Sequence, residues 1–267
     1  MKSVESQARL QYHLNPVRIR YTPGIGVCVL KSDGVGEEEL PERIVHLIDY
    51  GMGNLHSVSK AFEKAGASVL ISDNPNEISR AEALVLPGVG AFRAAMCELQ
   101  ERSLIEPIMA HVRLGKPFIG ICLGYQLLFE SSEEDGPVKG LGIFKGEVVR
   151  FQNHALEGDE TNPTDEGQIS HLTSVPLKIP HMGWNQVRQV QRSELFECIP
   201  DDAFFYFVHS YYPVPRDPNV VIGETEYGVS FASVVGKDRI YGVQFHPEKS
   251  QTIGARMLSN FVRIAFG

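Results

Sequence analysis

The sequence has little of what marks several large classes of protein. Its apolar runs, such as Ala83 to Leu86 and Phe118 to Cys122, are far shorter than the roughly 20 residues that a transmembrane helix needs. Lysine and arginine number 25 against 33 acidic residues, and the net charge of −8 argues against a nucleic-acid-binding surface. The four cysteines lie far apart without a CxxC pair: Cys28, Cys97, Cys122 and Cys198. They indicate reduced thiols in a cytoplasmic protein. From the run lengths and the net charge we expect neither a membrane nor a nucleic acid as a partner.

No histidine or cysteine spacing suits a zinc site, and no motif requires an organic cofactor. We therefore expect neither a metal nor a cofactor. What remains is ordinary globular composition, with 43% hydrophobic and 22% charged residues in 267 positions. That length predicts one large domain or two small ones with a substantial core.

Two segments lack the patterning of a core. Residues 1–31 carry five basic residues and one acid, and residues 32–42 are acidic. We expect 1–42 to be a poorly ordered extension; an organelle leader or an upstream start codon would also fit this composition. Residues 152–175 contain five acids and no lysine or arginine, which predicts an acidic surface loop inserted in a domain that spans 43–267.

The first half of that domain alternates short apolar strands with helical patterns. Strands are predicted at 44–49, 68–71, 83–86 and 117–122, and helices at 55–65, 91–114 and 123–131. The strands are apolar throughout, as in strands buried on both faces. From Gly142 on, short β-like runs follow, and a helix over 252–265 closes the chain. The sequence predicts an α/β fold, a mostly parallel central sheet flanked by helices, with extra strands in the C-terminal half.

The most informative motif is Gly120-Ile121-Cys122-Leu123-Gly124, where a strand meets a helix. It has the pattern of a nucleophile elbow, in which glycines on either side leave room for a sharp turn. A cysteine at a helix start is placed to ionise, and the N–H of Leu123 is placed to stabilise an oxyanion. The alternative is a small buried cysteine at a strand end.

A thiol nucleophile needs a base and a group that orients the base. His246-Pro247-Glu248 follows a strand, and in an extended segment His246 and Glu248 lie on one face. Proline stiffens the pair. A second turn, Pro87-Gly88-Val89-Gly90, ends a neighbouring parallel strand, so we expect its backbone N–H groups beside the elbow as part of an oxyanion hole.

These motifs, in this order, resemble the class I (triad-type) glutamine amidotransferases, and among them the glutaminase subunits of imidazole glycerol phosphate synthase. The stretches that carry the resemblance are DYGMGNLHSV (49–58), LPGVGAF (86–92), GICLGYQLLFESSEE (120–134), IPHMGWN (179–185), YFVHSYY (206–212) and GVQFHPEKS (242–250). They span essentially residues 43–267. The elbow and the HPE tripeptide are shared across triad amidotransferases, whereas DYGMGN, PGVGAF and PHMGWN point to this branch.

The resemblance implies that Cys122, His246 and Glu248 form a triad that hydrolyses glutamine to glutamate and ammonia through a thioester. It places Leu123, Gly88, Val89 and Gly90 at the oxyanion hole. It also implies glutamine contacts from five residues: Gly90, Gln126, His209, Ser210 and Tyr211. The ammonia would pass to a (β/α)8-barrel cyclase subunit in a heterodimer of histidine biosynthesis, a lyase step, with Asn54, Trp184 and Lys249 toward that partner.

Two other functions are compatible with parts of the pattern. Another α/β thiol hydrolase would share the elbow, but it would need neither Glu248 nor a partner. A catalytically silent scaffold would have no chemical reason to retain the whole triad. Single residues also have simpler interpretations: Trp184 as a core anchor and His209 as a hydrogen-bonded buried histidine.

Overall fold

The computed structural model describes residues 18–22, 26–30, 43–152 and 177–267. The chain divides into two compact units, residues 1–41 and 42–267. In the first unit, β1 (Arg18–Thr22) and β2 (Gly26–Leu30) pair as an antiparallel hairpin. The rest of the predicted extension and nearly all of the predicted acidic loop lie outside the described residues. Among the described residues, no helix is long and apolar enough to cross a membrane.

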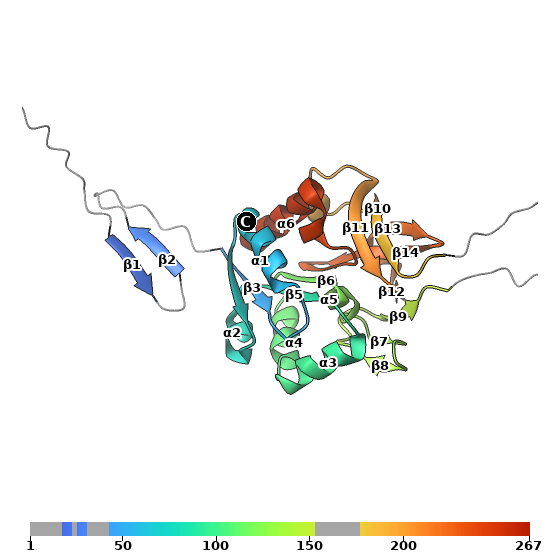
Figure 1. The fold of residues 1–267 in the computed structure, drawn as a ribbon, viewed down its shortest axis with the longest axis horizontal. Coiled ribbons are helices and arrows are strands. Elements are labelled where there is room, and N and C mark those ends of the chain that lie inside the picture. The colour runs from blue at the N-terminus through green and yellow to red at the C-terminus, as the bar shows by residue number, and fades with distance from the viewer. Residues whose placement is uncertain (1–17, 23–25, 31–42, 153–176) are drawn as a thin grey trace, which may run out of the picture. The chain divides into compact units, whose positions relative to one another are not determined.

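The second unit is built on a nine-stranded sheet in the order β11-β10-β13-β14-β15-β6-β5-β3-β4 (Figure 1). Its parallel part consists of β3 (Ile44–Ile48), β4 (Ser68–Ser72), β5 (Ala83–Gly88), β6 (Phe118–Cys122) and β15 (Ile240–Val243). Antiparallel strands extend it from β15: β14 (Val229–Lys237), β13 (Val221–Tyr227), β10 (His181–Gln189) and β11 (Ala203–His209). The predicted fold class is confirmed.

Helices cover both faces of the parallel strands, which explains why those strands do not alternate in polarity (Figure 1). On one face, α1 (Leu55–Lys64) and α6 (Gln251–Phe266) enclose a core that includes Val85 of β5. On the other, α3 (Phe92–Glu101) and α4 (Ile105–Arg113) pack over Leu84 and Leu86 of the same strand. All six residues of β5 are buried as a result.

A small second sheet, in the order β12-β9-β7-β8, lies beside the first. Its strands are β7 (Ser131–Ser132), β8 (Val138–Lys139), β9 (Gly146–Arg150) and β12 (Tyr211–Pro215). Only Ser210 separates β11 from β12, so the chain changes sheets at that residue. Short 3₁₀ turns occupy Glu194–Phe196, Pro218–Val220 and Pro247–Lys249.

Two helix predictions were wrong, and one helix was not predicted. The predicted helix over 91–114 is two helices, because Ser103 between α3 and α4 has a left-handed backbone with φ 57°. The predicted helix over 123–131 is only α5 (Leu123–Gln126), since the chain turns into β7. The helix that was not predicted is α2 (Pro75–Arg80), whose six residues are too few for a periodic pattern.

Candidate active site around Cys122

Cys122 sits on a strained turn between β6 and α5. Its φ of 55° with ψ of −110° is a conformation that side-chain-bearing residues rarely adopt. The flanking glycines are required by space: a Cβ on Gly120 would lie 2.6 Å from the carbonyl oxygen of Gly124, and one on Gly124 would lie 1.8 Å from that of Leu86. The predicted elbow geometry is therefore present. Because α5 has four residues, it contributes its first N–H groups rather than a long helix's dipole.

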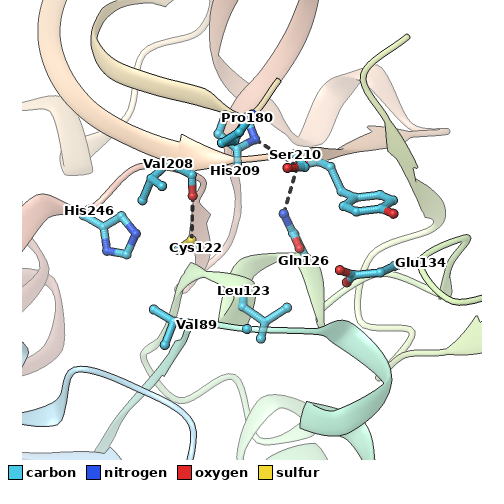
Figure 2. Close-up of a pocket in the computed structure, with 12 residues that line it drawn as sticks. Val89, Cys122, Leu123, Gln126, Glu134, Pro180, Val208, His209, Ser210 and His246 are labelled. Carbon is cyan, nitrogen blue, oxygen red and sulfur yellow. Dashed lines mark hydrogen bonds between the residues drawn. The ribbon is translucent and has the colours of Figure 1, made fainter. Parts of the chain in front are cut away.

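His246 and Glu248 form a buried pair next to the thiol. His246 Nδ1 lies 2.8 Å from Glu248 Oε1, and the two side chains are 3% and 1% exposed. The prediction of an extended segment is wrong, since Pro247–Lys249 forms a 3₁₀ turn that nevertheless brings the two groups together. The other ring nitrogen, Nε2, is buried without a hydrogen-bond partner among the described residues, and Figure 2 shows the ring on the side of Cys122.

The charge state of His246 depends on these neighbours. Burial alone would lower the pKa of His246, but the interactions with the Cys122 thiol and with Glu248 outweigh burial and raise the pKa to about 10. The imidazolium is therefore favoured at neutral pH, and a positive ring beside the sulfur favours a thiolate. The Sγ atom also has two uncharged neighbours, the Val208 carbonyl oxygen and Gln244 Nε2, each 4.0 Å away.

The predicted oxyanion turn stands beside the elbow. Gly88 is the register partner of Cys122 across the parallel pair β5 and β6. A Cβ on Gly88 would come within 2.3 Å of the hydroxyl of Tyr50, which itself donates a 2.8 Å hydrogen bond to the Pro87 carbonyl. Burial raises the pKa of Tyr50, so this hydroxyl keeps its proton and its bond. Gly90 has φ of +102°, where only glycine is relaxed.

The elbow opens into a pocket of about 400 Å³. Nine of the predicted site residues line it: Val89, Gly90, Cys122, Leu123, Gln126, His209, Ser210, Tyr211 and His246 (Figure 2). Gly88 and Glu248 do not line it; Gly88 pairs with Cys122, and Glu248 contacts His246. The remaining lining residues, not predicted, are Glu134, Pro180 and Val208.

Glu134 is the one carboxylate among the pocket-lining residues, and no lysine or arginine accompanies it. Its Oε2 accepts a 2.8 Å hydrogen bond from the backbone N–H of Phe92. Burial raises the pKa of Glu134, although that hydrogen bond acts in the opposite direction. Glu134 is the last residue of the motif at 120–134, but the motif predicted no role for it. Its adjacency to the elbow depends on the turn from α5 into β7, which no local pattern reveals.

His209 is held in a hydrogen-bonded row. Its Nδ1 lies 2.9 Å from the Tyr211 carbonyl oxygen, and its Nε2 lies 2.9 Å from Nδ1 of His181. The Nε2 of His181 lies 3.2 Å from Nδ2 of Asn185. Burial lowers the pKa of His209 to about 3 and that of His181 to about 4, so both rings are neutral at pH 7. His209 therefore offers the pocket its ring surface, since both nitrogens are engaged.

The three residues predicted to face a partner lie outside the pocket. Asn54 caps α1, its Oδ1 accepting a 3.3 Å hydrogen bond from Ser57 N–H. Trp184 is 46% exposed, which excludes the alternative of a core anchor. The Nζ of Lys249 lies 5.9 Å from the ring centroid of Tyr206. Two further large apolar side chains are exposed on the same pair of strands as Trp184: Met182 (61%) on β10 and Phe204 (53%) on β11.

Two further facts bear on the sequence predictions. Cys97, Cys122 and Cys198 carry free thiols. In the part of the chain that the structure describes, no three histidine, cysteine or acidic side chains are grouped as metal ligands.

The chain is similar in sequence to a family of known proteins. The family described as "Glutamine amidotransferase class-I" matches residues 46–265. The imidazole glycerol phosphate synthase subunit HisH of Syntrophotalea carbinolica is 47% identical over 218 residues, covering 82% of this chain and 98% of the relative. The protein of the same name from Geobacillus thermodenitrificans is 45% identical over 224 residues, covering 84% and 97%.

Solved structures share the fold at low identity. A putative GMP synthase component from Thermoplasma acidophilum has a TM-score of 0.57 at 18% identity, covering 83% of this chain and 93% of that one. A second structure, described as a glutamine amidotransferase, has a TM-score of 0.56 at 17% identity, covering 83% and 98%.

Proposed function

Because the chain belongs to the class I glutamine amidotransferase family, we propose that it is the glutaminase subunit of an imidazole glycerol phosphate synthase. It would hydrolyse glutamine to glutamate and ammonia for histidine biosynthesis. The observation that carries the proposal is the row of Cys122, His246 and Glu248, whose first two members line a pocket large enough to admit an amino acid. The cyclisation would belong to the partner subunit.

The first half of the proposed reaction forms a thioester. The Cys122 thiolate attacks the side-chain amide carbon of glutamine, and the carbonyl oxygen gains the negative charge. Backbone N–H groups of Leu123 and of the Gly88–Gly90 segment would stabilise that oxyanion. As the C–N bond breaks, protonated His246 gives its proton to the departing nitrogen, which leaves as ammonia. Glu248 holds the imidazole in place through its 2.8 Å contact.

The second half hydrolyses the thioester. Neutral His246 removes a proton from a water molecule, whose oxygen attacks the same carbon. The C–S bond then breaks, which releases glutamate and restores the thiolate beside a protonated imidazole.

The pocket also suits the α-amino acid end of the substrate. Glu134 would pair with the α-ammonium group, because it is the one carboxylate among the lining residues. The α-carboxylate would then bind backbone N–H groups of Ser210 and Tyr211, where the chain passes from β11 to β12. Gly90, Gln126 and His209 complete the walls and fix the length of side chain that the pocket admits.

A partner is proposed from the exposed apolar face on β10 and β11. Met182, Trp184 and Phe204 are large apolar side chains left exposed, which favours association, and the cation of Lys249 lies 5.9 Å from the ring centroid of Tyr206 on β11. We place the (β/α)8-barrel cyclase subunit there, with Asn54 at the same junction. Ammonia would pass across it to react with a ribonucleotide and yield imidazole glycerol phosphate and an aminoimidazole carboxamide ribonucleotide.

The test uses Cys122→Ala in the heterodimer. The variant should release no ammonia from glutamine, yet the complex should form and use free ammonium at the wild-type rate. An electrophilic glutamine analogue should label Cys122 stoichiometrically in the wild type, which a silent scaffold would not show. Loss of the ammonium-dependent reaction in the variant would contradict the division of labour between two subunits.

A further inference from the structure

Gln244 is a completely buried amide that the proposed mechanism has not used. It follows β15 directly, two residues before His246, and its side chain has two polar neighbours. Its Oε1 accepts a 3.2 Å hydrogen bond from Nε2 of Gln126. Its Nε2 lies 4.0 Å from Sγ of Cys122. Both the oxygen and the NH₂ group of a buried amide need hydrogen-bond partners. The orientation of the Gln244 amide therefore decides which of the two faces the nucleophile.

The orientation of the amide follows from a backbone carbonyl. The carbonyl oxygen of Tyr211 can only accept hydrogen bonds, and the amide of Gln126 meets it at 2.9 Å. Gln126 must therefore present its NH₂ group there, and the same NH₂ group also faces Gln244. The atom of Gln244 that accepts this hydrogen bond must therefore be its amide oxygen. The NH₂ group of Gln244 therefore faces the sulfur of Cys122.

The two uncharged neighbours of the sulfur favour opposite states. The Val208 carbonyl, at 4.0 Å, accepts from a neutral S–H and opposes a negative sulfur. The Gln244 N–H, also at 4.0 Å, donates and therefore favours the thiolate. Cys122 is 6% exposed, and in such a site a hydrogen bond to a charged sulfur is stronger than it would be in bulk water. Removal of the Gln244 donor would leave the Val208 carbonyl as the one uncharged neighbour and would make the Cys122 thiolate harder to form.

We propose that Gln244 is a catalytic residue that donates its side-chain N–H to the Cys122 thiolate, held in that direction by Gln126. The proposal rests on the proposed function, because it assigns a further group to the same reaction. It makes Gln126 a positioning residue as well as a wall of the pocket. A purely structural role for Gln244, as a polar filler between β15 and α5, would leave the reactivity of the sulfur unchanged.

The test measures the pH dependence of Cys122 alkylation by iodoacetamide in the full chain, resolved by mass spectrometry of the Cys122 peptide. Gln244→Met keeps the length of the side chain but removes its N–H donor. Gln244→Leu also removes the donor, and it does so without placing a thioether sulfur beside Cys122. In both, the pH midpoint of alkylation should rise by about one unit, with kcat for glutaminase down about tenfold and KM within about twofold.

Ser233→Ala is the matched control. It removes a buried 2.8 Å hydrogen bond with Thr225 on the neighbouring strands, without touching the sulfur, and should leave the alkylation midpoint at the wild-type value. Should the Gln244 variants not fold, Gln126→Leu carries the test, because it releases the amide of Gln244 and should move the midpoint in the same direction.

An unchanged midpoint in folded Gln244→Met and Gln244→Leu would overturn the proposal, whatever their stability. The alkylation readout needs no glutamine hydrolysis. A wild-type chain that formed no glutamate would contradict the proposed function, whereas an unmoved midpoint would contradict only the role of Gln244.

Discussion

Gly88 and Cys122 are register partners on adjacent parallel strands, so the proposed oxyanion segment and the nucleophile are held by one ladder of hydrogen bonds. The hydroxyl of Tyr50 occupies the space above Gly88, 2.3 Å from where a Cβ would lie. The distance between the turn and the sulfur is thereby set by β5 and β6, whereas the segment beyond, at Gly90, retains the freedom of a glycine with φ of +102°.

Gly88→Ala should therefore cost activity more than Tyr50→Phe does. The added methyl group meets the Tyr50 hydroxyl and, at 3.0 Å, the N–H of Gly124, which should lower the free energy of unfolding by about 1–3 kcal/mol. We expect glutaminase activity to fall at least about tenfold as the oxyanion donors shift. The double variant with Tyr50→Phe should recover part of both losses. No recovery in urea unfolding or in kcat would contradict the steric explanation.

Glu248→Gln should weaken the base without removing it. The pKa of His246 is about 10, burial lowering it and the contacts with Cys122 and Glu248 raising it. Since this exceeds the unfolded value of about 6.5, the associated stability is complete below pH 6.5 and is lost as the pH rises toward 10. In Glu248→Gln the loss over that window should be smaller.

The same variant should lower kcat on the order of a hundredfold. Exposed Glu147→Gln is the matched control and should change neither kcat nor the pH dependence of unfolding. Wild-type-like kcat in Glu248→Gln would show that the carboxylate does not orient the base.

The His181–His209 row predicts sensitivity to acid. Burial lowers the pKa of these two rings to about 4 and about 3, below the unfolded value of about 6.5. The unfolded chain therefore binds protons first, and stability falls as the pH drops below 6.5, by about 1.4 kcal/mol per pH unit for each ring.

His181→Phe should flatten this dependence in urea unfolding between pH 7 and pH 4.5, although it costs stability at pH 7 by removing a hydrogen bond from His209. Exposed His56→Gln should retain the wild-type slope. An unchanged slope in His181→Phe would mean that the row is not neutral in the folded protein.

Trp184→Ala should separate partner binding from chemistry. The side chain is 46% exposed and lies outside the pocket, so alkylation of Cys122 should keep its wild-type rate. The affinity for the cyclase subunit should fall about tenfold or more, as for a large aromatic residue at an interface. Leu114→Ala, which removes an apolar side chain that is 69% exposed at the end of α4, should not change the affinity. Equal effects of both variants in a titration would contradict the placement of the interface.

The sequence predicted the elbow, the neighbouring glycine turn and the base because each is a short motif at the end of an apolar strand. Parallel strands end at one edge of a sheet, so the meeting of Gly88 and Cys122 follows from the fold class alone. The resemblance also supplied Gln126 and the 209–211 segment, which the structure brings to the same pocket.

What the sequence could not provide are contacts that depend on tertiary placement. Glu134 and Gln244 carry no local signal, because the one is brought to the pocket by a turn after a shortened helix and the other by the pairing of β15 with β6. His181 reaches His209 only through the antiparallel register of β10 and β11. The break at Ser103 likewise interrupts a helical pattern that propensity alone would continue.

Glutamate formation from glutamine tests the central claim most directly, measured for the chain alone and then with the ribonucleotide ligand and the (β/α)8-barrel cyclase subunit. The account predicts low activity alone and stimulation of at least about tenfold in the complex, as the backbone at Val89 and Gly90 reorients. If the chain alone were highly active and the partner did not change its activity, the triad would still be supported. That result would contradict both activation by the partner and the assignment to this synthase.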